Sequence, residues 1–545
     1  MSKPVLDSQG SGVTSVLGER LWQLGGVLGV LGMSGWMLSQ MGPHGLTGFP
    51  LDDAWIHLVY ARSVSESFFL AYNEGIASTG STSVLWSYML GGLHVFLRST
   101  ESMVWGVKGA GILLQAWMAW QVFHLARALT HSVFWGCLSA MLLGFSPALT
   151  FAAMSGMEVA LGSALCLAGL RSWVDEKPLS SGVWLGLAGL ARPEFAVACL
   201  LLLAYEASAS FKATRPFRKL WRLVLPIVVC AALSLGWNWA VDGRPFPATY
   251  YAKAVPAGMD VWSRLTSGMR IVLGHAPLSP AWLVVGALGW LMARKALPRK
   301  GLLVLLCGMG YFAANLYLIA PVHESAFYHI RYLLPAVPLL LVGLIPGVRY
   351  VILRVWGTRG RPGPAATAAL QVFGSLLLLG WNVSEGRAWA TKYDRDCRNI
   401  NEVQVALGRD IARALPREAR VGTLDAGAIR YFGEHETVDL MGLNTPLEDD
   451  VACRSAPLDV LALMPAWVTL PKGPRWAPLR VRRTLDYQLT ESPQMGTQVL
   501  LACESLKRRE ALPVRLSILG RSRDVCLACW TTKEVEALRE SLGAE

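Results

Sequence analysis

Long apolar runs alternate with short polar stretches over residues 21–384, and they predict transmembrane helices. A span needs about 20 predominantly apolar residues. Eleven segments fit this pattern: 21–41, 102–126, 132–150, 158–174, 181–192, 194–208, 220–240, 280–293, 301–319, 332–348 and 366–384. The pair 181–192 and 194–208 is split by Arg192-Pro193-Glu194, so one kinked span is the alternative there.

Basic residues between the spans set the predicted orientation, because cytoplasmic loops carry the excess of Lys and Arg. Three clusters stand out, at 212–222, 294–300 and 349–361. The segment 83–97 is also apolar. If it is a helix that lies on or half inside the membrane without crossing it, all three clusters fall on the same side as the N-terminus. The external stretches are then 42–101, 151–158, the turn at Arg192, 241–279, 320–331 and everything after 384.

The pattern changes at both ends of this region. Residues 1–20 are polar, and we expect a disordered cytoplasmic N-terminus. Residues 385–545 show helical spacing at 399–415 and strand-like runs, which predict a soluble, external α/β domain with a partly parallel sheet. The expected strands lie at 421–424, 438–440, 466–470 and 499–502.

Composition agrees with this division. The chain of 545 residues is 53% hydrophobic and 16% charged, against about 25% charged in soluble proteins. Residues 381–545 hold 23 basic and 23 acidic residues, whereas 1–380 hold 27 and 15, so the whole net charge of +12 lies in the apolar part. A simple soluble enzyme is excluded. Nucleic-acid binding is not expected, because the basic residues alternate with hydrophobic runs.

The first external stretch begins with two adjacent carboxylates, Asp52 and Asp53. In one interpretation Asp52 caps a helix over 53–66 and Asp53 favours the helix dipole. In the other, the pair supplies a general base or a metal ligand at the membrane face. A helix would place Asp53, His57 and Tyr60 on one face.

The other external stretches carry further polar groups that can meet in one cavity: Arg62, Asn73, Glu158, Arg192, Glu194, Tyr250, Tyr251, Lys253, His329 and Arg331. Charges at membrane depth, such as Arg192 and Glu194, indicate function, although a structural pair that locks two helices is equally consistent. Interfacial anchoring is the alternative around 323–332. Carboxylates and cations on one side of a bundle suit a reaction between a lipid-anchored phosphate and a hydroxyl group.

Several short motifs, in order along nearly the whole chain, resemble polyprenyl-phosphate-dependent glycosyltransferases of the GT-C superfamily, most closely the mycobacterial-type terminal arabinofuranosyltransferases. The matching stretches are DDAWIHLVYARSV with YNEG and GSTSVLW (52–86), SGME (155–158), ARPE (191–194), TYYAK (249–253), RYLLP (331–335), and DAG with DLMGL (425–427 and 439–443). Val59 and Phe195 depart from the family pattern, which has Arg and Gly there.

The resemblance implies a polytopic α-helical GT-C-type membrane enzyme and inverting transfer of a sugar from a polyprenyl phosphate. It implies Asp52 as general base, and Asp53 as a residue that orients the acceptor. Arg62, Lys253, His329 and Arg331 would neutralise the donor phosphate. The substrate contacts would be Asn73, Glu158, Arg192, Glu194, Tyr250 and Tyr251.

The implied acceptor is a hydroxyl of an envelope glycan, lipid or protein outside a bacterial inner membrane. The sequence requires no cofactor, although Asp52 and Asp53 offer a site for Mg²⁺, Mn²⁺ or Ca²⁺. Two other classes stay open: a non-catalytic envelope protein with a partner-binding external domain, and a lipid or glycan transporter. A transporter is less consistent with the sequence, because the chain shows no internal repeat.

Overall fold

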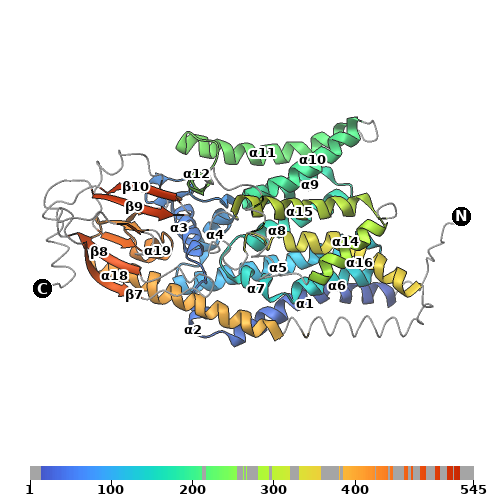
Figure 1. The fold of residues 1–545 in the computed structure, drawn as a ribbon, viewed down its shortest axis with the longest axis horizontal. Helices are drawn as coiled ribbons and strands as arrows, with labels where there is room; N and C mark the ends of the chain where they lie inside the picture. The colour runs from blue at the N-terminus through green and yellow to red at the C-terminus, as the bar shows by residue number, and fades with distance from the viewer. Residues whose placement is uncertain are drawn as a thin grey trace.

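The computed structural model describes residues 14–211, 217–253, 262, 266, 280–293, 297–319, 331–357, 380, 384–423, 425–439 and 442–445, and the backbone of the strands between 460 and 527. The molecule is elongated, with a helix bundle at one end and strands at the other (Figure 1). Helices α3 and α4 lie between the two parts.

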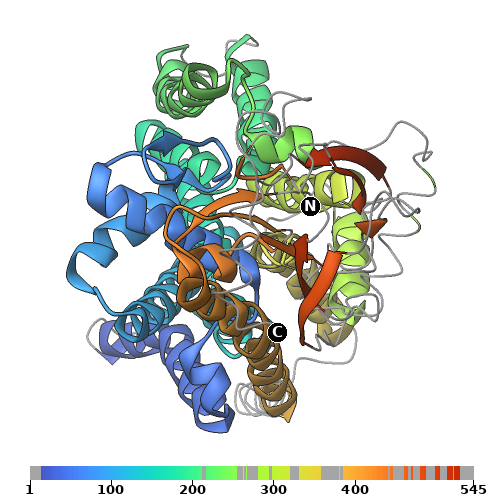
Figure 2. The same ribbon diagram turned by 90° about the vertical axis from the view of Figure 1, so that its left-hand side faces the viewer.

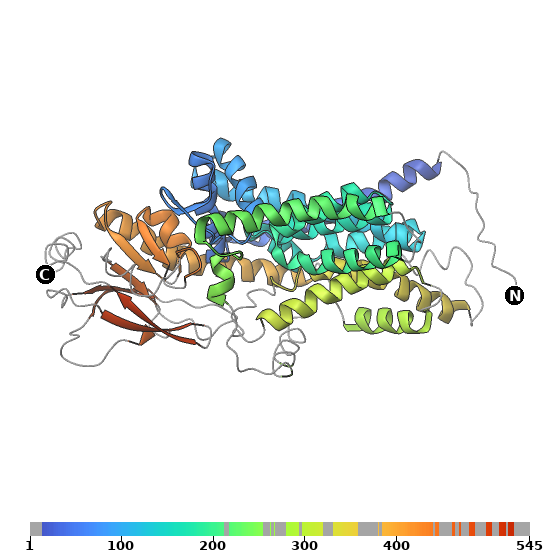
Figure 3. The same cartoon turned by 90° about the horizontal axis from the view of Figure 1, so that it is seen from above.

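The bundle contains helices that coincide with ten of the eleven expected segments; the last, 366–384, lies almost wholly outside the described residues. Figure 3 shows these helices side by side, with the strands beyond one end. Their bounds are α1 (Thr14–Gln40), α5 (Thr100–Thr130), α6 (Val133–Gly144), α7 (Pro147–Met154), α8 (Val159–Val174), α9 (Pro178–Ala191), α10 (Ala196–Phe211), α11 (Phe217–Asp242), α14 (Pro280–Ala293), α15 (Arg299–Ile319) and α16 (Ala336–Gly357).

Within the described residues, three stretches are long and apolar enough to cross a membrane: Pro193–Phe211, Phe217–Asp242 and Ala336–Arg354. A fourth results if α6 and α7 together form one span. Apolar helices that fall short of this length include α8, α9 and α4 (Val84–Phe96). The number of eleven spans therefore stays a prediction.

Two local expectations need correction. The segment 132–150 is not one helix: α6 and α7 meet at an angle of 57°. The cause is Ser146-Pro147, because Pro cannot continue a helix, while Ser146 caps α7 through the amide of Leu149. At the N-terminus, α1 begins at Thr14, so residues 14–20 are helical and not disordered. Leu17, Glu19 and Arg20 are good helix formers.

The chain enters the strand-rich end through a helix over 384–400, which continues through a π-helical turn (Asn401–Val405) into α18 (Ala406–Ala414). One sheet has the order β4-β3-β5-β8-β7, with β3 (Arg420–Thr423) parallel to both β4 (Glu436–Asp439) and β5 (Val460–Leu463). The remaining pairs in it are antiparallel, to β8 (Gln498–Cys503) and β7 (Leu479–Leu485).

A second sheet has the order β10-β9-β6 and is antiparallel; its strands are β10 (Arg521–Leu527), β9 (Leu512–Ile518) and β6 (Val468–Thr469). Figure 2 views the molecule from this end. The four expected strands coincide with β3, β4, β6 and β8, and the pairing is partly parallel as expected. That 385–545 forms a separate domain stays a prediction.

Residues 42–101, predicted as the first external stretch, fold into short elements that pack between the bundle and the sheet. They are α2 (Pro43–Thr47), α3 (Asp52–Ser67), the hairpin β1 (Ala71–Asn73) and β2 (Ile76–Ala77), and α4. Helix α3 ends where Phe68 adopts a left-handed conformation and its amide bonds the carbonyl of Val64. Helix α19 (Ala428–Gly433) packs on α3, and this contact places the strand-rich end over the bundle.

Candidate active site

Asp52 stands at the first residue of α3 and joins it to the C-terminal part of the chain. Its carboxylate accepts hydrogen bonds from the amides of Gly427 (2.7 Å) and Ala428 (2.8 Å), at the start of α19. Burial raises the pKa of Asp52 well above its usual value, and the charge of Asp425 adds to this, whereas the two amide bonds oppose it.

The interpretation that Asp52 caps its own helix is therefore wrong. The residue before α3 is Leu51, and no side chain caps that end. Asp52 instead satisfies the two amides that begin α19, a helix 375 residues further along the chain. The cap exists, but it serves another helix, which sequence spacing alone does not reveal.

Asp53 points to a different partner. Its carboxylate lies 2.5 Å from the guanidinium of Arg331, just before α16. The Arg331 side chain is 9% exposed, and that of Asp53 is 38% exposed. The same guanidinium also bonds the hydroxyl of Tyr332 at 3.0 Å. A buried, carboxylate-held guanidinium is a preorganised site for an anion.

A second cluster of charged side chains lies next to α3. Glu158, at the start of α8, is 3.4 Å from Arg192 and 3.2 Å from the imidazole of His57. Glu194 also reaches Arg192, at 3.4 Å. Burial alone would raise the pKa of Glu158, but Arg192 and His57 hold it at about 2. Glu158 is therefore ionised, and its charge is compensated inside the protein.

Arg192 connects the cluster around Glu158 to the Asp53–Arg331 pair. Its guanidinium donates to the backbone carbonyl of Arg331 at 3.4 Å, and both guanidiniums lie against the ring of Tyr332, at 5.5 and 4.9 Å from its centroid. The structure thus brings together five of the residues expected from sequence. They are Asp53, Glu158, Arg192, Glu194 and Arg331.

The first external stretch and residues 426–444 form one hydrogen-bonded unit. The hydroxyl of Tyr72 donates to the carbonyl of Ala426 at 2.6 Å. The amide side chain of Asn73 makes two bonds to the backbone of Thr437, both 2.9 Å long. Further along, the hydroxyl of Tyr60 donates to the Asn444 side chain at 3.0 Å. Asn73, expected to contact substrate, is thus placed as a bridge to β4.

Other expected residues belong to α3 and to residues 248–253. Arg62 pairs with Glu434 at 3.4 Å and covers the ring of Tyr431, so it fastens α3 to α19. Tyr250 and Tyr251 lie in α12 (Ala248–Lys253), where Tyr250 is exposed. Lys253 ends this helix. His329 lies outside the described residues.

A metal site at Asp52 and Asp53 gains no further ligands from the described residues. Among them, no group of three or more His, Cys, Asp or Glu side chains is arranged to hold a metal ion. The two carboxylates also turn to different partners, the amides of α19 and Arg331. A divalent cation at this site stays an untested prediction.

Sequence reasoning missed Lys108, the only charged residue in the expected span 102–126. Its ammonium is buried and donates to the carbonyls of Gly45 and Leu46 in α2. On the other side of α2, the amide of Gly45 donates to Asp394 at 2.6 Å. Helix α2 is thus fixed between α5 and the helix over 384–400. A charged residue inside an apolar segment was the available signal.

Comparisons with known proteins show which solved structures share this fold. The structure is similar to ArnT from Cupriavidus metallidurans, solved bound to undecaprenyl phosphate, with a TM-score of 0.51 and 13% sequence identity; the match covers 90% of this chain and 98% of ArnT. The apo structure of the same protein matches equally, with 99% of its chain covered. Archaeal AglB from Archaeoglobus fulgidus, an oligosaccharyltransferase in complex with an inhibitory peptide and a dolichol-phosphate, matches with a TM-score of 0.42 and 11% identity, over 82% of this chain and 69% of its own; this likeness is too low to support an argument.

The chain therefore has a mostly helical fold similar to that of ArnT. At such identity the likeness shows the fold alone, and the expected resemblance to the mycobacterial arabinofuranosyltransferases stays a prediction. Residues 398–509 match a domain of unknown function (DUF8728). A search of curated proteins by sequence gave no match.

Proposed function

We propose that this chain is an integral-membrane inverting glycosyltransferase that uses a polyprenyl-phosphate sugar donor. The observation that carries the proposal is the meeting of Asp52, Asp53 and Arg331 where the first external stretch, the bundle and the C-terminal part join. The resemblance of the sequence motifs to GT-C enzymes supports it. The shared fold with ArnT, solved with undecaprenyl phosphate, supports the class of donor.

In the proposed reaction an acceptor hydroxyl attacks the anomeric carbon of the donor. The new carbon–oxygen bond forms as the bond from that carbon to the phosphate oxygen breaks, and polyprenyl phosphate leaves with the electron pair. Asp52 takes the hydroxyl proton. Its raised pKa supports this role, because a carboxylate is a better general base when its pKa lies nearer the working pH; such catalysis contributes about 10²–10⁴ in rate.

Arg331 has the geometry to stabilise the charge that develops on the leaving phosphate. Its guanidinium is buried and fixed by Asp53 and Tyr332, so little reorganisation is needed when the donor arrives. Arg192, held by Glu158 and Glu194, keeps the segment before α16 in place through the carbonyl of Arg331. Asp53 would exchange this ion pair for contacts with the acceptor.

The acceptor in this proposal is a hydroxyl of an envelope glycan, lipid or protein on the external face of a bacterial inner membrane. The predicted topology, with a cytoplasmic N-terminus and an external strand-rich end, supports that side. The strand-rich end lies next to α3 (Figure 1), and this proximity supports it as the part that would bind a polymer acceptor. Lys253, His329, Tyr250 and Tyr251 remain proposed donor and acceptor contacts.

The test is sugar transfer by the full-length protein in membranes or detergent, with a panel of polyprenyl-phosphate sugars. Asp52→Asn should lower kcat by about 10² or more, and Asp53→Asn should lower activity as well. Asp410→Asn, whose carboxylate pairs with Arg413 within α18, is the matched control and should retain wild-type activity. Turnover of a donor with both site variants at wild-type rates would refute the proposed mechanism.

One observation favours a second candidate, a non-catalytic envelope protein. Both oxygens of Asp52 already accept hydrogen bonds, so the residue has a structural role whether or not it is a base. In that case Asp52→Asn lowers the melting temperature, and no donor in the panel is consumed. In the enzyme, the loss of kcat is larger than any loss of folded protein explains, so activity normalised to folded protein separates the two.

A further inference from the structure

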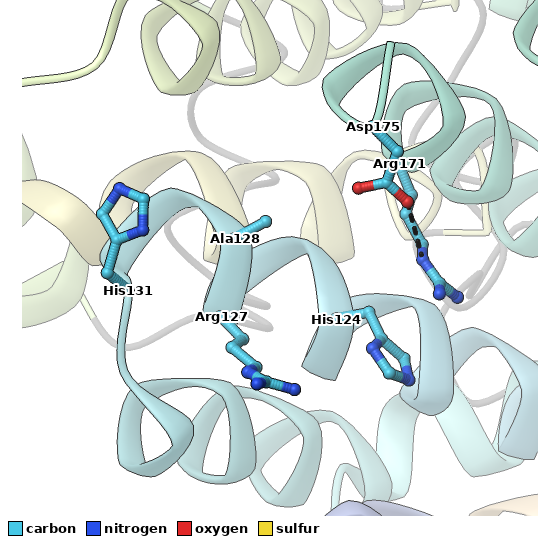
Figure 4. A pocket seen from close by; sticks show the side chains of 6 residues that line it. All are labelled: His124, Arg127, Ala128, His131, Arg171 and Asp175. Carbon is cyan, nitrogen blue, oxygen red and sulfur yellow. Dashed lines mark ion pairs between the residues drawn. The ribbon is translucent and has the colours of Figure 1, made fainter. Parts of the chain in front are cut away.

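A polar cavity lies at the far end of the bundle from the proposed active site. Its volume is about 420 Å³, and it is lined by His124, Arg127, Ala128, His131, Arg171 and Asp175. Figure 4 shows these side chains, which come from the ends of α5 and α8. Helix α8 begins next to Glu158 and ends at Val174, so its 16 residues put about 24 Å between the two sites.

Positive charge dominates the wall of the cavity. Arg127 approaches from α5 and Arg171 from α8, whereas Asp175 is the only carboxylate among the lining residues. Asp175 is 3.7 Å from Arg171, and Gln121 holds the same guanidinium at 3.2 Å. Arg171 is therefore fixed in orientation but is only partly neutralised.

The imidazoles add polar atoms to the same wall. The Nε2 atom of His124 is buried and has no hydrogen-bond partner among the described residues. His131, which follows α5, is exposed at the rim in a left-handed conformation. Two guanidiniums and two imidazoles around one concavity are complementary to a phosphate group, since Arg bonds phosphate oxygens in bidentate geometry.

The next carboxylate along the chain, that of Glu176, is engaged by other cations. Glu176, the residue after Asp175, binds Lys219 of α11 and Lys300 of α15. The carboxylate of Glu176 is thus used by lysines outside the cavity. Because these lysines belong to the predicted cytoplasmic clusters, the cavity opens on the same side of the membrane as they do.

We propose that this cavity binds a phosphate group at the end of the bundle opposite the active site. The group is carried either by the head of an anionic phospholipid or by free inorganic phosphate. Basic pockets between membrane helices bind anionic head groups on the cytoplasmic side, and a cavity of this volume is large enough for one.

The test uses full-length protein purified in detergent, with two probes kept apart. Native mass spectrometry measures binding of phosphatidylglycerol against phosphatidylcholine, and thermal unfolding measures stabilisation by inorganic phosphate. Arg127→Gln and Arg171→Gln should each weaken phosphatidylglycerol binding by about tenfold, because each removes a charged donor to the phosphate. Arg98→Gln is the control, since Arg98 lies on an exposed turn before α5, at the other end of that helix.

Asp175→Asn is expected to strengthen binding, which a loss of folded protein cannot imitate. Removing this carboxylate from the lining should tighten binding of the same probe severalfold. A response to phosphatidylglycerol alone identifies the lipid head group, and a response to inorganic phosphate identifies the free anion. If all three cavity variants bind both probes like Arg98→Gln, the proposal is wrong. Sugar transfer is not part of either readout, so failure of the proposed enzyme activity leaves this test intact.

Discussion

The carboxylate of Asp53 lies 2.5 Å from the guanidinium of Arg331, a residue 278 positions away in the sequence. The pair connects the start of α3 to the turn that precedes α16. Because the Arg331 side chain is 9% exposed, its charge sits where water screens it little. The first external stretch and the bundle thus meet at a preorganised cation, which is the centre of the proposed donor site.

Arg331→Gln is expected to lower kcat/KM by about 10² or more, because the leaving phosphate loses its charged donor. Arg331→Lys should recover only part of the activity, since an ammonium cannot bond both Asp53 and Tyr332 in the same fork geometry. The measurement is kcat/KM with the preferred donor. Full activity in Arg331→Gln would remove this residue from the mechanism.

The pH dependence should report Asp52. Its pKa is raised by burial and by the charge of Asp425, and a general base acts only when deprotonated. Transfer should therefore fall as the pH drops through this raised pKa and recover above it. Asp425→Asn removes the repulsion, so it should move the acidic limb of the kcat/KM profile to lower pH. An identical limb in wild type and Asp425→Asn would show that another group controls it.

Glu158→Gln is expected to destabilise the fold. Arg192 would keep Glu194 as its carboxylate partner. Breaking a buried ion pair costs about 3–5 kcal/mol, so the fall should be toward the lower end of that range. Thermal unfolding in detergent measures it. Glu402→Gln, which breaks an exposed pair with Arg398, is the control and should change little.

The pairing of Glu158 with Arg192 also predicts how stability changes with pH. The folded pKa of Glu158 is about 2 and its ordinary value is 4.5, so the unfolded state binds the proton more strongly. The stabilisation from Glu158 is present above pH 4.5 and is lost as the pH falls toward 2. In Glu158→Gln this part of the acid destabilisation should be absent. A parallel acid response in both proteins would contradict the assigned pairing.

Gly427→Ala should separate the strand-rich end from α3. A Cβ atom at Gly427 would overlap the backbone carbonyl of Asp52 and lie 2.7 Å from its carboxylate oxygen, so the backbone must shift. Limited proteolysis should cut the variant faster within the C-terminal part. The control is Gly109→Ala in α5, where nothing lies within 4 Å of the new Cβ and the helix should gain stability of about 0.5–1 kcal/mol. Equal protection of both variants would show that this contact does not hold the two parts together.

Much of the helical structure could be predicted from the sequence, because hydrophobic runs and their ends are local signals. The break at Ser146-Pro147 was visible in principle, since Pro and a capping Ser mark a helix start. The strands near 421 and 499 could be predicted for the same reason, but the order β4-β3-β5-β8-β7 could not. Strand order depends on contacts between distant segments, and spacing along the chain does not encode it.

The candidate site shows the same limit. The sequence indicated Asp52, Asp53, Glu158, Arg192 and Arg331 as polar groups in external stretches, but each had many conceivable partners. The structure directs Asp52 to the amides of α19 and Asp53 to Arg331, although the two carboxylates are adjacent in sequence. On a helix, neighbouring residues project about 100° apart, so adjacent side chains reach different surroundings.

The sequence by itself determined that this chain is rich in apolar helices and that its charge divides at about residue 380. These properties follow from composition and local periodicity. Only the tertiary structure decided which charges pair, that Asp52 caps a distant helix, and that Arg127 and Arg171 share one cavity. Such pairings are set by the packing of elements far apart in the chain, where burial makes an unpaired charge too costly to leave.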